Sequence, residues 1–402
     1  MLSYLCRRKV KFPIQSLLLI GLVASAMAGS GCNLERATGL EQPSSLASTP
    51  VDWLMEGGGP ERSRTTTEMI LPPLVAQERY VVGGDTQFVS PVAVTADFLL
   101  ADGDHRLHAF GRADGQEKWR IDLPGSYLSP AIADNTVYVR AEAGQAGFVV
   151  ALDSITGQVK WRFPFPKVGS EFGNVGGHVT SPLIVNELVL IGAARTMYAL
   201  DAATGAVVWH FDSVEPIASS AAVTDDIVYF SDFTHIYAVD LPSGQAQWQF
   251  QQESMTLFFA PIIAQERVII ADHDTIQALS RMDGQPLWQQ TFPKEVIPAA
   301  ATADQIFVKT VNQLWALNAE NGEILWDYSA LNFVSLPAIT DRQIYIITRS
   351  DGGSQLRALQ RTDGKEQWRT ENLPLSNSAP VAAQGAVYIR TVNGGVIGYR
   401  AR

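Results

Sequence analysis

Cysteine is nearly absent from this sequence of 402 residues. The two cysteines are Cys6 and Cys32, and no cysteine follows Cys32. The chain beyond that point therefore contains no disulfide, no thiolate metal site and no cysteine nucleophile.

Long hydrophobic runs are scarce as well. The most apolar segment near the N-terminus runs from Leu17 to Ala28, which is shorter than the roughly 20 apolar residues that a transmembrane helix needs. Because a basic patch at residues 7–11 precedes this segment, the pattern is typical of a secretory signal peptide. The sequence thus predicts an exported chain that has no transmembrane helix after processing.

Two cleavage sites compete at the end of this segment. Residues 26–28 (Ala-Met-Ala) have the small-x-small form of an ordinary signal cleavage site. Residues 29–32 (Gly-Ser-Gly-Cys) resemble a bacterial lipobox, in which the cysteine is lipidated and becomes the new N-terminus. We therefore predict a signal peptide at residues 1–31 and lipidation of Cys32. Cleavage after Ala28 would instead leave a soluble secreted protein.

The segment that follows the lipobox has the composition of a linker. Residues 32–50 are rich in Ser, Thr, Pro and Gly and show no periodicity, which predicts a flexible tether. Asn33 follows the cysteine, in place of the aspartate associated with retention in the inner membrane. The resemblance to lipoproteins therefore implies a position at the periplasmic face of the outer membrane.

Basic residues are few. The formal net charge is −11, and removal of Arg7, Arg8, Lys9 and Lys11 with the signal peptide would leave 26 basic groups against 41 acidic ones. This charge repels phosphate backbones, so nucleic acid is excluded as an expected partner.

The sequence does contain a repeat of about forty residues. Seven times, a short apolar strand with a small Ala is followed by a polar turn with Gly and, four residues after that Gly, by Trp. A short hairpin turn needs a residue with φ > 0, which Gly adopts without strain. The glycines are Gly115, Gly157, Gly205, Gly244, Gly284, Gly322 and Gly364, and the tryptophans are Trp119, Trp161, Trp209, Trp248, Trp288, Trp326 and Trp368.

Each repeat contains four predicted strands. A second pair, rich in β-branched and aromatic residues, lies upstream of the Ala strand, and in most repeats a proline opens the innermost strand. Four strands per forty residues, repeated, predict an all-β propeller at residues 51–402. Residues 378–399 supply only three strands of an eighth blade, and Leu74 to Val82 supplies the missing one. We predict eight blades closed by this N-terminal strand, with a seven-bladed ring as the alternative.

The repeat resembles the quinoprotein-type propeller repeat, Ala-Leu-Asp-x-x-Thr-Gly-x-x-x-Trp, which residues 199–209 match almost completely. The resemblance covers roughly residues 52–402. One branch of this family contains quinone-dependent dehydrogenases, and the other contains the non-catalytic BamB-like lipoproteins of outer-membrane protein assembly. The predicted signal peptide, lipobox, length and blade number resemble the BamB-like branch. This implies a scaffold that binds envelope proteins, with the outer-membrane assembly machinery as the expected partner.

No catalytic, cofactor-binding or metal-binding residue is predicted. The chain lacks the cysteine pair of many quinone dehydrogenases and matches none of their calcium ligands. His105, His235 and His273 lie near aspartates in hairpin loops, where both residue types are common in turns. The alternatives are a quinone- or metal-dependent oxidoreductase with a degenerate site and a secreted propeller module that binds other ligands.

Partner-binding residues are predicted in loops that lead into the innermost strands, because such loops gather on one face of a propeller. Aromatic residues and Met are favoured anchors of interfaces, whereas the alternative is that they plug the central channel or cap the sheets. The candidates are Met255, Leu257, Phe258, Phe259, Phe333, Tyr127 and Phe172.

Overall fold

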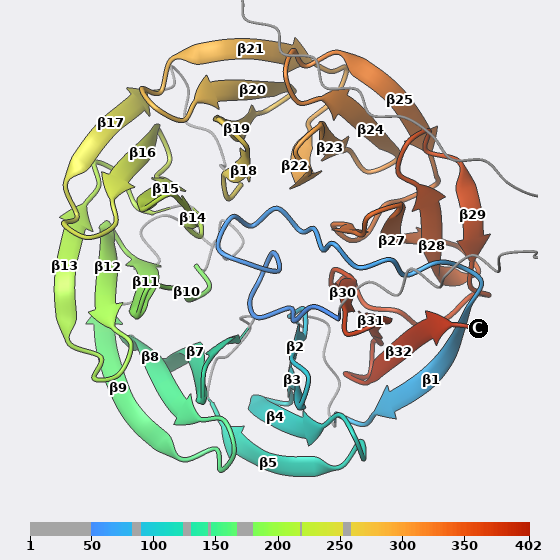
Figure 1. The fold of residues 1–402 in the computed structure, drawn as a ribbon, viewed down its shortest axis with the longest axis horizontal. Coiled ribbons are helices and arrows are strands. Elements are labelled where there is room, and N and C mark those ends of the chain that lie inside the picture. The colour runs from blue at the N-terminus through green and yellow to red at the C-terminus, as the bar shows by residue number, and fades with distance from the viewer. Residues whose placement is uncertain are drawn as a thin grey trace, which may run out of the picture. The chain divides into compact units, whose positions relative to one another are not determined.

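The computed structural model describes residues 50–82, 90–123, 130–143, 146–166, 180–217, 219–251 and 259–402. These residues form eight four-stranded sheets arranged as blades around a centre (Figure 1). The eight-bladed propeller predicted from the repeat is thereby confirmed. No helix within the described ranges is long and apolar enough to cross a membrane. The predicted signal peptide, Cys32 and nearly all of the tether lie outside the described residues.

The first four blades follow one another along the chain, each running from the innermost to the outermost strand. Blade 1 contains β2 (Ala93–Val94), β3 (Phe98–Gly103), β4 (Arg106–Gly111) and β5 (Glu117–Asp122). Blade 2 contains β6 (Ala131–Ala133), β7 (Thr136–Ala143), β8 (Ala146–Asp153) and β9 (Val159–Pro166). Blade 3 contains β10 (Leu183–Val185), β11 (Leu188–Ala193), β12 (Thr196–Asp201) and β13 (Val207–Asp212). Blade 4 contains β14 (Ala222–Thr224), β15 (Ile227–Ser231), β16 (His235–Asp240) and β17 (Ala246–Gln251).

The last four blades complete the ring. Blade 5 contains β18 (Ile262–Ala264), β19 (Arg267–Asp272), β20 (Thr275–Ser280) and β21 (Pro286–Thr291). Blade 6 contains β22 (Ile297–Ala301), β23 (Gln305–Lys309), β24 (Gln313–Asn318) and β25 (Ile324–Ser329). Blade 7 contains β26 (Ala338–Ile339), β27 (Gln343–Ser350), β28 (Gly353–Gln360) and β29 (Glu366–Arg369). Blade 8 contains β30 (Val381–Ala383), β31 (Ala386–Arg390) and β32 (Val396–Ala401), with β1 (Leu74–Tyr80) as its outermost strand.

The repeated alanine and tryptophan are opposite each other in the two outer strands of a blade. In blade 3, Ala199 pairs with Trp209, and the register shifts by a bulge directly after this pair. The same pair and the same bulge occur in blade 4 between Ala238 and Trp248. The small alanine is needed because this side of the strand is buried against the next blade.

The turn glycine has a second role that the sequence did not reveal. All seven repeat glycines have φ between +66° and +76°, as the hairpin turn requires. In six of them, a Cβ atom would also collide with the tryptophan ring of the preceding blade; at Gly244 it would lie 2.7 Å from the ring of Trp209. The indole N–H of Trp209 donates to the Leu241 carbonyl in the same turn, at 2.6 Å. Six of the seven repeat tryptophans thus dock on the turn of the following blade.

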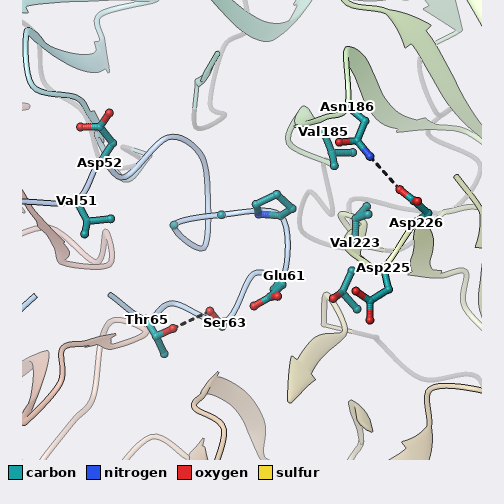
Figure 2. A pocket seen from close by; sticks show the side chains of 14 residues that line it. Val51, Asp52, Glu61, Ser63, Thr65, Val185, Asn186, Val223, Asp225 and Asp226 are labelled. Atoms are coloured by element: carbon teal, nitrogen blue, oxygen red, sulfur yellow. Dashed lines mark hydrogen bonds between the residues drawn. The ribbon is translucent and has the colours of Figure 1, made fainter. Parts of the chain in front are cut away.

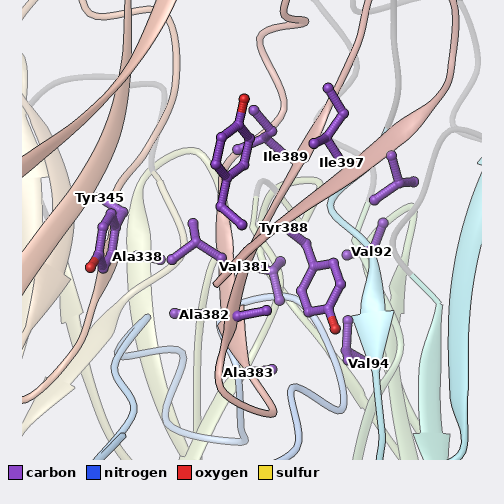
Figure 3. Close-up of a cluster of buried hydrophobic side chains, with 14 of the residues drawn as sticks. Val92, Val94, Ala338, Tyr345, Val381, Ala382, Ala383, Tyr388, Ile389 and Ile397 are labelled. Carbon is purple, nitrogen blue, oxygen red and sulfur yellow. The ribbon is translucent and has the colours of Figure 1, made fainter. Parts of the chain in front are cut away.

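The N-terminal strand closes the ring as predicted. β1 pairs with β32 from Leu74 opposite Ala401 to Tyr80 opposite Val396. Behind it lies a buried cluster that joins blades 7, 8 and 1 (Figure 3). It includes Tyr345, Tyr388 and Val94, one from each of these blades. The closing blade therefore has its own apolar core although it lacks the repeat tryptophan.

Candidate functional site

A segment before β1, Val51–Glu68, crosses the centre of the ring (Figure 1). We call this segment the strap. Its backbone forms hydrogen bonds with seven of the eight blades, each at the innermost strand or at the turn that follows that strand. The bonded pairs are Trp53 and Val94, Leu54 and Ile132, Pro60 and Val223, Glu61 and Ile263, Ser63 and Ala301, Arg64 and Ile339, and Val51 and Gln384. These strands end on the same face of the ring, which we call the strap face. The centre of that face is thus occupied by the chain itself.

Two glycines allow the strap to reverse direction. Gly57 and Gly58 have φ of +83° and +90°. A Cβ on Gly57 would lie 2.7 Å from the Cα of Arg62, so the backbone approaches itself too closely for a side chain. The ring of the buried Trp53 packs against Gly58. This turn brings the side chains of the following residues back toward blades 3 and 4.

An ionic cluster lies at this turn, with two buried arginines around a partly exposed carboxylate. Glu56 pairs with Arg62 at 3.3 Å and with Arg64 at 3.4 Å, and it accepts a hydrogen bond from the Ser181 hydroxyl at 2.6 Å. Burial alone would raise the pKa of the Glu56 carboxyl, but the two arginines and the Ser181 hydroxyl hold it below its usual value. Arg62 also donates to the Ala221 carbonyl before blade 4. The cluster attaches the strap to blade 3, the one blade to which it makes no backbone bond among the described residues.

The far end of the strap is held by a buried carboxylate. Glu68 is 1% exposed and accepts the backbone N–H groups of Val51, Gln384 and Gly385 at 2.5, 2.7 and 2.6 Å. Three N–H donors satisfy a buried carboxylate without a cation. One side chain thus joins both ends of the strap to blade 8.

A hollow of about 690 Å³ lies between the strap and blades 3 and 4 (Figure 2). Acidic side chains from two elements line it: Asp52 and Glu61 of the strap, and Asp225 and Asp226 after β14. Asn186 donates to Asp226 at 2.9 Å across the gap between the two blades. Within the described ranges, no three His, Cys, Asp or Glu side chains form a group that could hold a metal ion. The hollow therefore presents acidic and hydroxyl groups to solvent.

The opposite face carries the loops that lead into the innermost strands, and we call it the loop face. Of the predicted partner-binding residues, Met255, Leu257, Phe258, Tyr127 and Phe172 lie outside the described residues.

The other two predicted partner-binding residues lie in different places. Phe259 is partly buried against the core of blades 5 and 6. Phe333 leads into blade 7 and is 3% exposed, because its ring packs into the core between blades 6 and 7. The structure does not bring these two residues together, and it places Phe333 in the core where the sequence suggested an exposed anchor.

Exposed apolar residues flank Phe333, and sequence reasoning missed them. Leu331 and Val311 are 81% and 66% exposed. The two loops are joined by hydrogen bonds, since Phe333 N–H donates to the Val311 carbonyl at 2.6 Å and Ala330 N–H to that of Asn312 at 3.1 Å. The sequence contained a signal for this pair, because Val311 lies in the hairpin between β23 and β24 and Leu331 lies in the loop after β25, where polar residues are expected.

The histidines singled out from the sequence serve hairpin turns. His105 and His273 have φ of 58° and 55°, which is turn geometry. His235 lies against the buried Asp232, whose carboxylate accepts the backbone N–H groups of Thr234 and His235 at 2.7 and 2.6 Å. All three histidines thus lie in or directly after the hairpin turn between the second and third strands of their blades.

Comparison with known proteins identifies similar chains. The profile of the family described as outer membrane protein assembly factor BamB matches residues 56–166, 145–275 and 272–402. BamB of Bordetella pertussis is 26% identical over 262 residues, which are 62% of this chain and 63% of that protein, so the match spans less than two thirds of that relative. The dehydrogenase subunit of a quinone alcohol dehydrogenase from Gluconobacter oxydans is 27% identical over 188 residues, 38% of this chain and 25% of that protein. The crystal structure of BamB from Moraxella catarrhalis, at 17% identity and a TM-score of 0.61, covers 82% of this chain and 98% of that one, which shows the shared fold.

Proposed function

The chain belongs to the BamB family of PQQ-like repeat propellers, and from this premise we propose that it is a non-catalytic scaffold of the bacterial envelope that binds other proteins through its loop face. In this role the protein holds a partner close to the membrane and catalyses no covalent chemistry. Family membership alone does not assign this role, because propellers with the same repeat serve different functions.

One observation supports the scaffold most directly: the strap. It fills the centre of the strap face and connects all eight blades, which makes the ring a rigid support for its loops. Ligand sites in such folds need a concave space with converging polar groups. At the turn of the strap, the polar groups are instead bonded to one another, as Glu56 is to Arg62 and Arg64, and the acidic hollow beside blades 3 and 4 is open to solvent.

The proposed location follows from the N-terminal sequence. Lipidation of Cys32 would anchor the chain at the periplasmic face of the outer membrane, and residues 32–50 would tether the propeller. The proposed partner is a component of the outer-membrane protein assembly machinery. The excess of acidic over basic residues disfavours direct adsorption of the propeller to anionic headgroups, so the lipid would supply the attachment.

Co-purification from gently solubilised envelopes tests this proposal. We expect an outer-membrane assembly protein to be recovered with the wild-type chain and to be reduced at least tenfold with Leu331→Ser/Val311→Ser on the loop face. The matched control is Val207→Ser/Val208→Ser, which removes two exposed apolar side chains from the outer strand of blade 3. Equal recovery with both variants would contradict a loop-face site, and no recovered protein from any sample would contradict the scaffold.

The similarity to a quinone alcohol dehydrogenase favours one second candidate, an oxidoreductase. It predicts that the purified protein changes its absorbance when pyrroloquinoline quinone and calcium are added. An unchanged spectrum, together with partner recovery, would exclude this candidate.

A further inference from the structure

Three cations occupy the same position in three different blades. They are Arg140 in blade 2, Lys309 in blade 6 and Arg390 in blade 8, each on the second strand of its blade. Each is paired with the third-strand residue that lies two places before the repeated Ala. In blade 8, Gly398 takes the place of that Ala. All three are buried. Because the three cations have equivalent positions in their blades, the contacts of each one can be compared directly with those of the other two.

Two of these cations reach across to the next blade and find partners there. Arg390 pairs with the Asp102 carboxylate of blade 1 at 3.0 Å and donates to the Ser90 carbonyl at 3.1 Å. Arg140 donates to the Thr180 hydroxyl at 3.0 Å and to the Gly192 carbonyl of blade 3 at 2.8 Å. A charge in this position thus requires a polar partner from the following blade.

For Lys309, the described part of the chain supplies no such partner. It is 7% exposed, and no hydrogen bond or ion pair joins its amine to any residue in the described part of the chain. Side chains alternate along a strand, so Lys309 points to the same side as Phe307, which packs against Ile339 and Ile344 of blade 7. The residue of blade 7 that corresponds to Asp102 is Ile347, opposite Leu356. At the strand position where blade 1 carries the carboxylate that neutralises Arg390, blade 7 therefore carries a hydrocarbon, which packs in the core of blades 7, 8 and 1.

Exposed apolar groups lie in the loop that follows Lys309 and in the loop bonded to it. Lys309 ends β23, and the next two residues lead to Val311, whose carbonyl holds the loop of Leu331 and Phe333. Burial lowers the pKa of the Lys309 amine, so an added carboxylate would stabilise its charged form. This part of the loop face therefore combines one cation, Lys309, with the exposed apolar side chains of Val311 and Leu331.

We propose that Lys309 receives a carboxylate attached to an apolar group, supplied by a partner polypeptide that docks at the junction of blades 6 and 7. The inference rests on the proposed function and adds the chemistry of the partner to it. The carboxylate completes at this junction the pair that Asp102 completes at the junction of blades 8 and 1. The apolar part of the partner contacts Leu331 and Val311.

Titration with hexanoate tests the site, with hexanamide as the uncharged control of equal length. Reductive ¹³C-methylation of the full chain gives one NMR signal per lysine, and Lys309→Met assigns the signal of Lys309. We expect hexanoate at millimolar concentration to shift this signal with saturation, hexanamide to leave it unchanged, and Lys309→Arg to retain protection by hexanoate in thermal unfolding. Lys309→Met keeps the packing and removes the charge, so its Tm is expected to equal or exceed that of the wild type and to lack any response to hexanoate. Equal responses to hexanoate and hexanamide, or none to either, would overturn the site.

Co-purification separates this inference from the function on which it rests. We expect Lys309→Met to reduce partner recovery at least tenfold. Undiminished recovery with Lys309→Met would overturn the role of Lys309 while the scaffold stands. If hexanoate binds but recovery is undiminished, the carboxylate belongs to a small molecule and the polypeptide source is wrong.

Discussion

Six junctions between neighbouring blades share one contact, whereas the two junctions of blade 8 do not have it. At each of the six, a tryptophan ring covers the turn glycine of the next blade, and its indole N–H donates to a carbonyl of that turn, as Trp119 does to Ser154 at 2.8 Å. At the end of the series, Trp368 meets the ring of Tyr399 with centroids 5.9 Å apart. At the start, a Cβ on Gly115 would meet no atom within 4 Å, because β1 carries no tryptophan toward it.

Polar pairs replace the tryptophan where the ring closes. Arg390 of blade 8 reaches Asp102 of blade 1, and Arg112 of blade 1 donates to the Tyr388 hydroxyl at 3.2 Å. Within blade 8, Glu78 on β1 accepts hydrogen bonds from Tyr80 at 2.7 Å and from Arg400 at 2.7 Å. The repeated junctions use one interchangeable contact, as repeat proteins do. The closing junctions use bonds that specify which strand closes the ring.

The largest effect is expected from the ion pair between blades 8 and 1. Arg390→Met leaves the buried Asp102 carboxylate without its cation, which typically costs about 3–5 kcal/mol. The free energy of unfolding in urea measures this loss. Asp102→Leu/Arg390→Met should recover most of it, because two apolar groups need no partner. A double variant as unstable as the single one would show that the pair is not the source of the loss.

A pair of glycine substitutions compares the two kinds of junction. Gly244→Ala puts a methyl group at φ +71° and 2.7 Å from the ring of Trp209, whereas Gly115→Ala has φ +66° and open space. We expect a loss of about 1–2 kcal/mol for Gly115→Ala from backbone strain alone, and a further loss of about 1–3 kcal/mol for Gly244→Ala from the collision. Thermal and urea unfolding of the two variants measure the difference. Equal losses would mean that the docked ring adapts freely.

Two tryptophan substitutions make a smaller comparison. Trp209→Phe removes a buried indole that donates to Leu241, so the unpaired carbonyl and the lost contact should cost about 1–3 kcal/mol. Among the described residues, the indole of Trp368 has no hydrogen-bond partner, so Trp368→Phe should cost less than about 1 kcal/mol. The midpoint of urea unfolding measures both variants, and a larger loss for Trp368→Phe would reverse the comparison.

Acid should weaken the closure through Glu78. Burial would raise the pKa of this carboxyl, but hydrogen bonds from Tyr80, Arg400 and Tyr388 bring it below its ordinary value of 4.5. A group with a lowered pKa in the folded state stabilises the fold above its unfolded pKa, and this stabilisation is lost as the pH falls through the folded value. Between pH 6 and pH 3, Glu78→Gln should therefore lose less unfolding free energy than the wild type.

The control for this pH dependence is Glu320→Gln, at an exposed carboxylate on the turn of blade 6. It should follow the wild type from pH 6 to pH 3. If Glu78→Gln also follows the wild type over this range, Glu78 does not contribute to the acid sensitivity of the closure.

The sequence predicted those features that recur or that bury apolar side chains. The Gly and Trp spacing predicted the blades, and the apolar stretch from Leu74 to Val82 predicted β1 as the closing strand. The strap was not predicted as a crossing segment, because it is held by backbone hydrogen bonds that leave no periodic pattern of side chains.

The candidate site was harder to predict than the fold. The sequence does not distinguish an exposed aromatic residue in a loop from a buried one, and Phe333 proved to be buried. In the sequence, Lys309 is indistinguishable from any lysine at the end of a strand. Whether its amine has a partner depends on which residues of blade 7 lie near it. Such information exists only once the register between blades is known.

The proposed scaffold requires that the loop face of the ring, and not the strap face, binds protein. Photo-cross-linking in intact envelopes tests this directly, with a photoreactive residue at Leu331 on the loop face or at Asp225, which is 75% exposed on the strap face. We predict a discrete cross-link from position 331 to an envelope protein and none from position 225. A cross-link from position 225 alone, or from neither position, would contradict a scaffold that acts through its loop face.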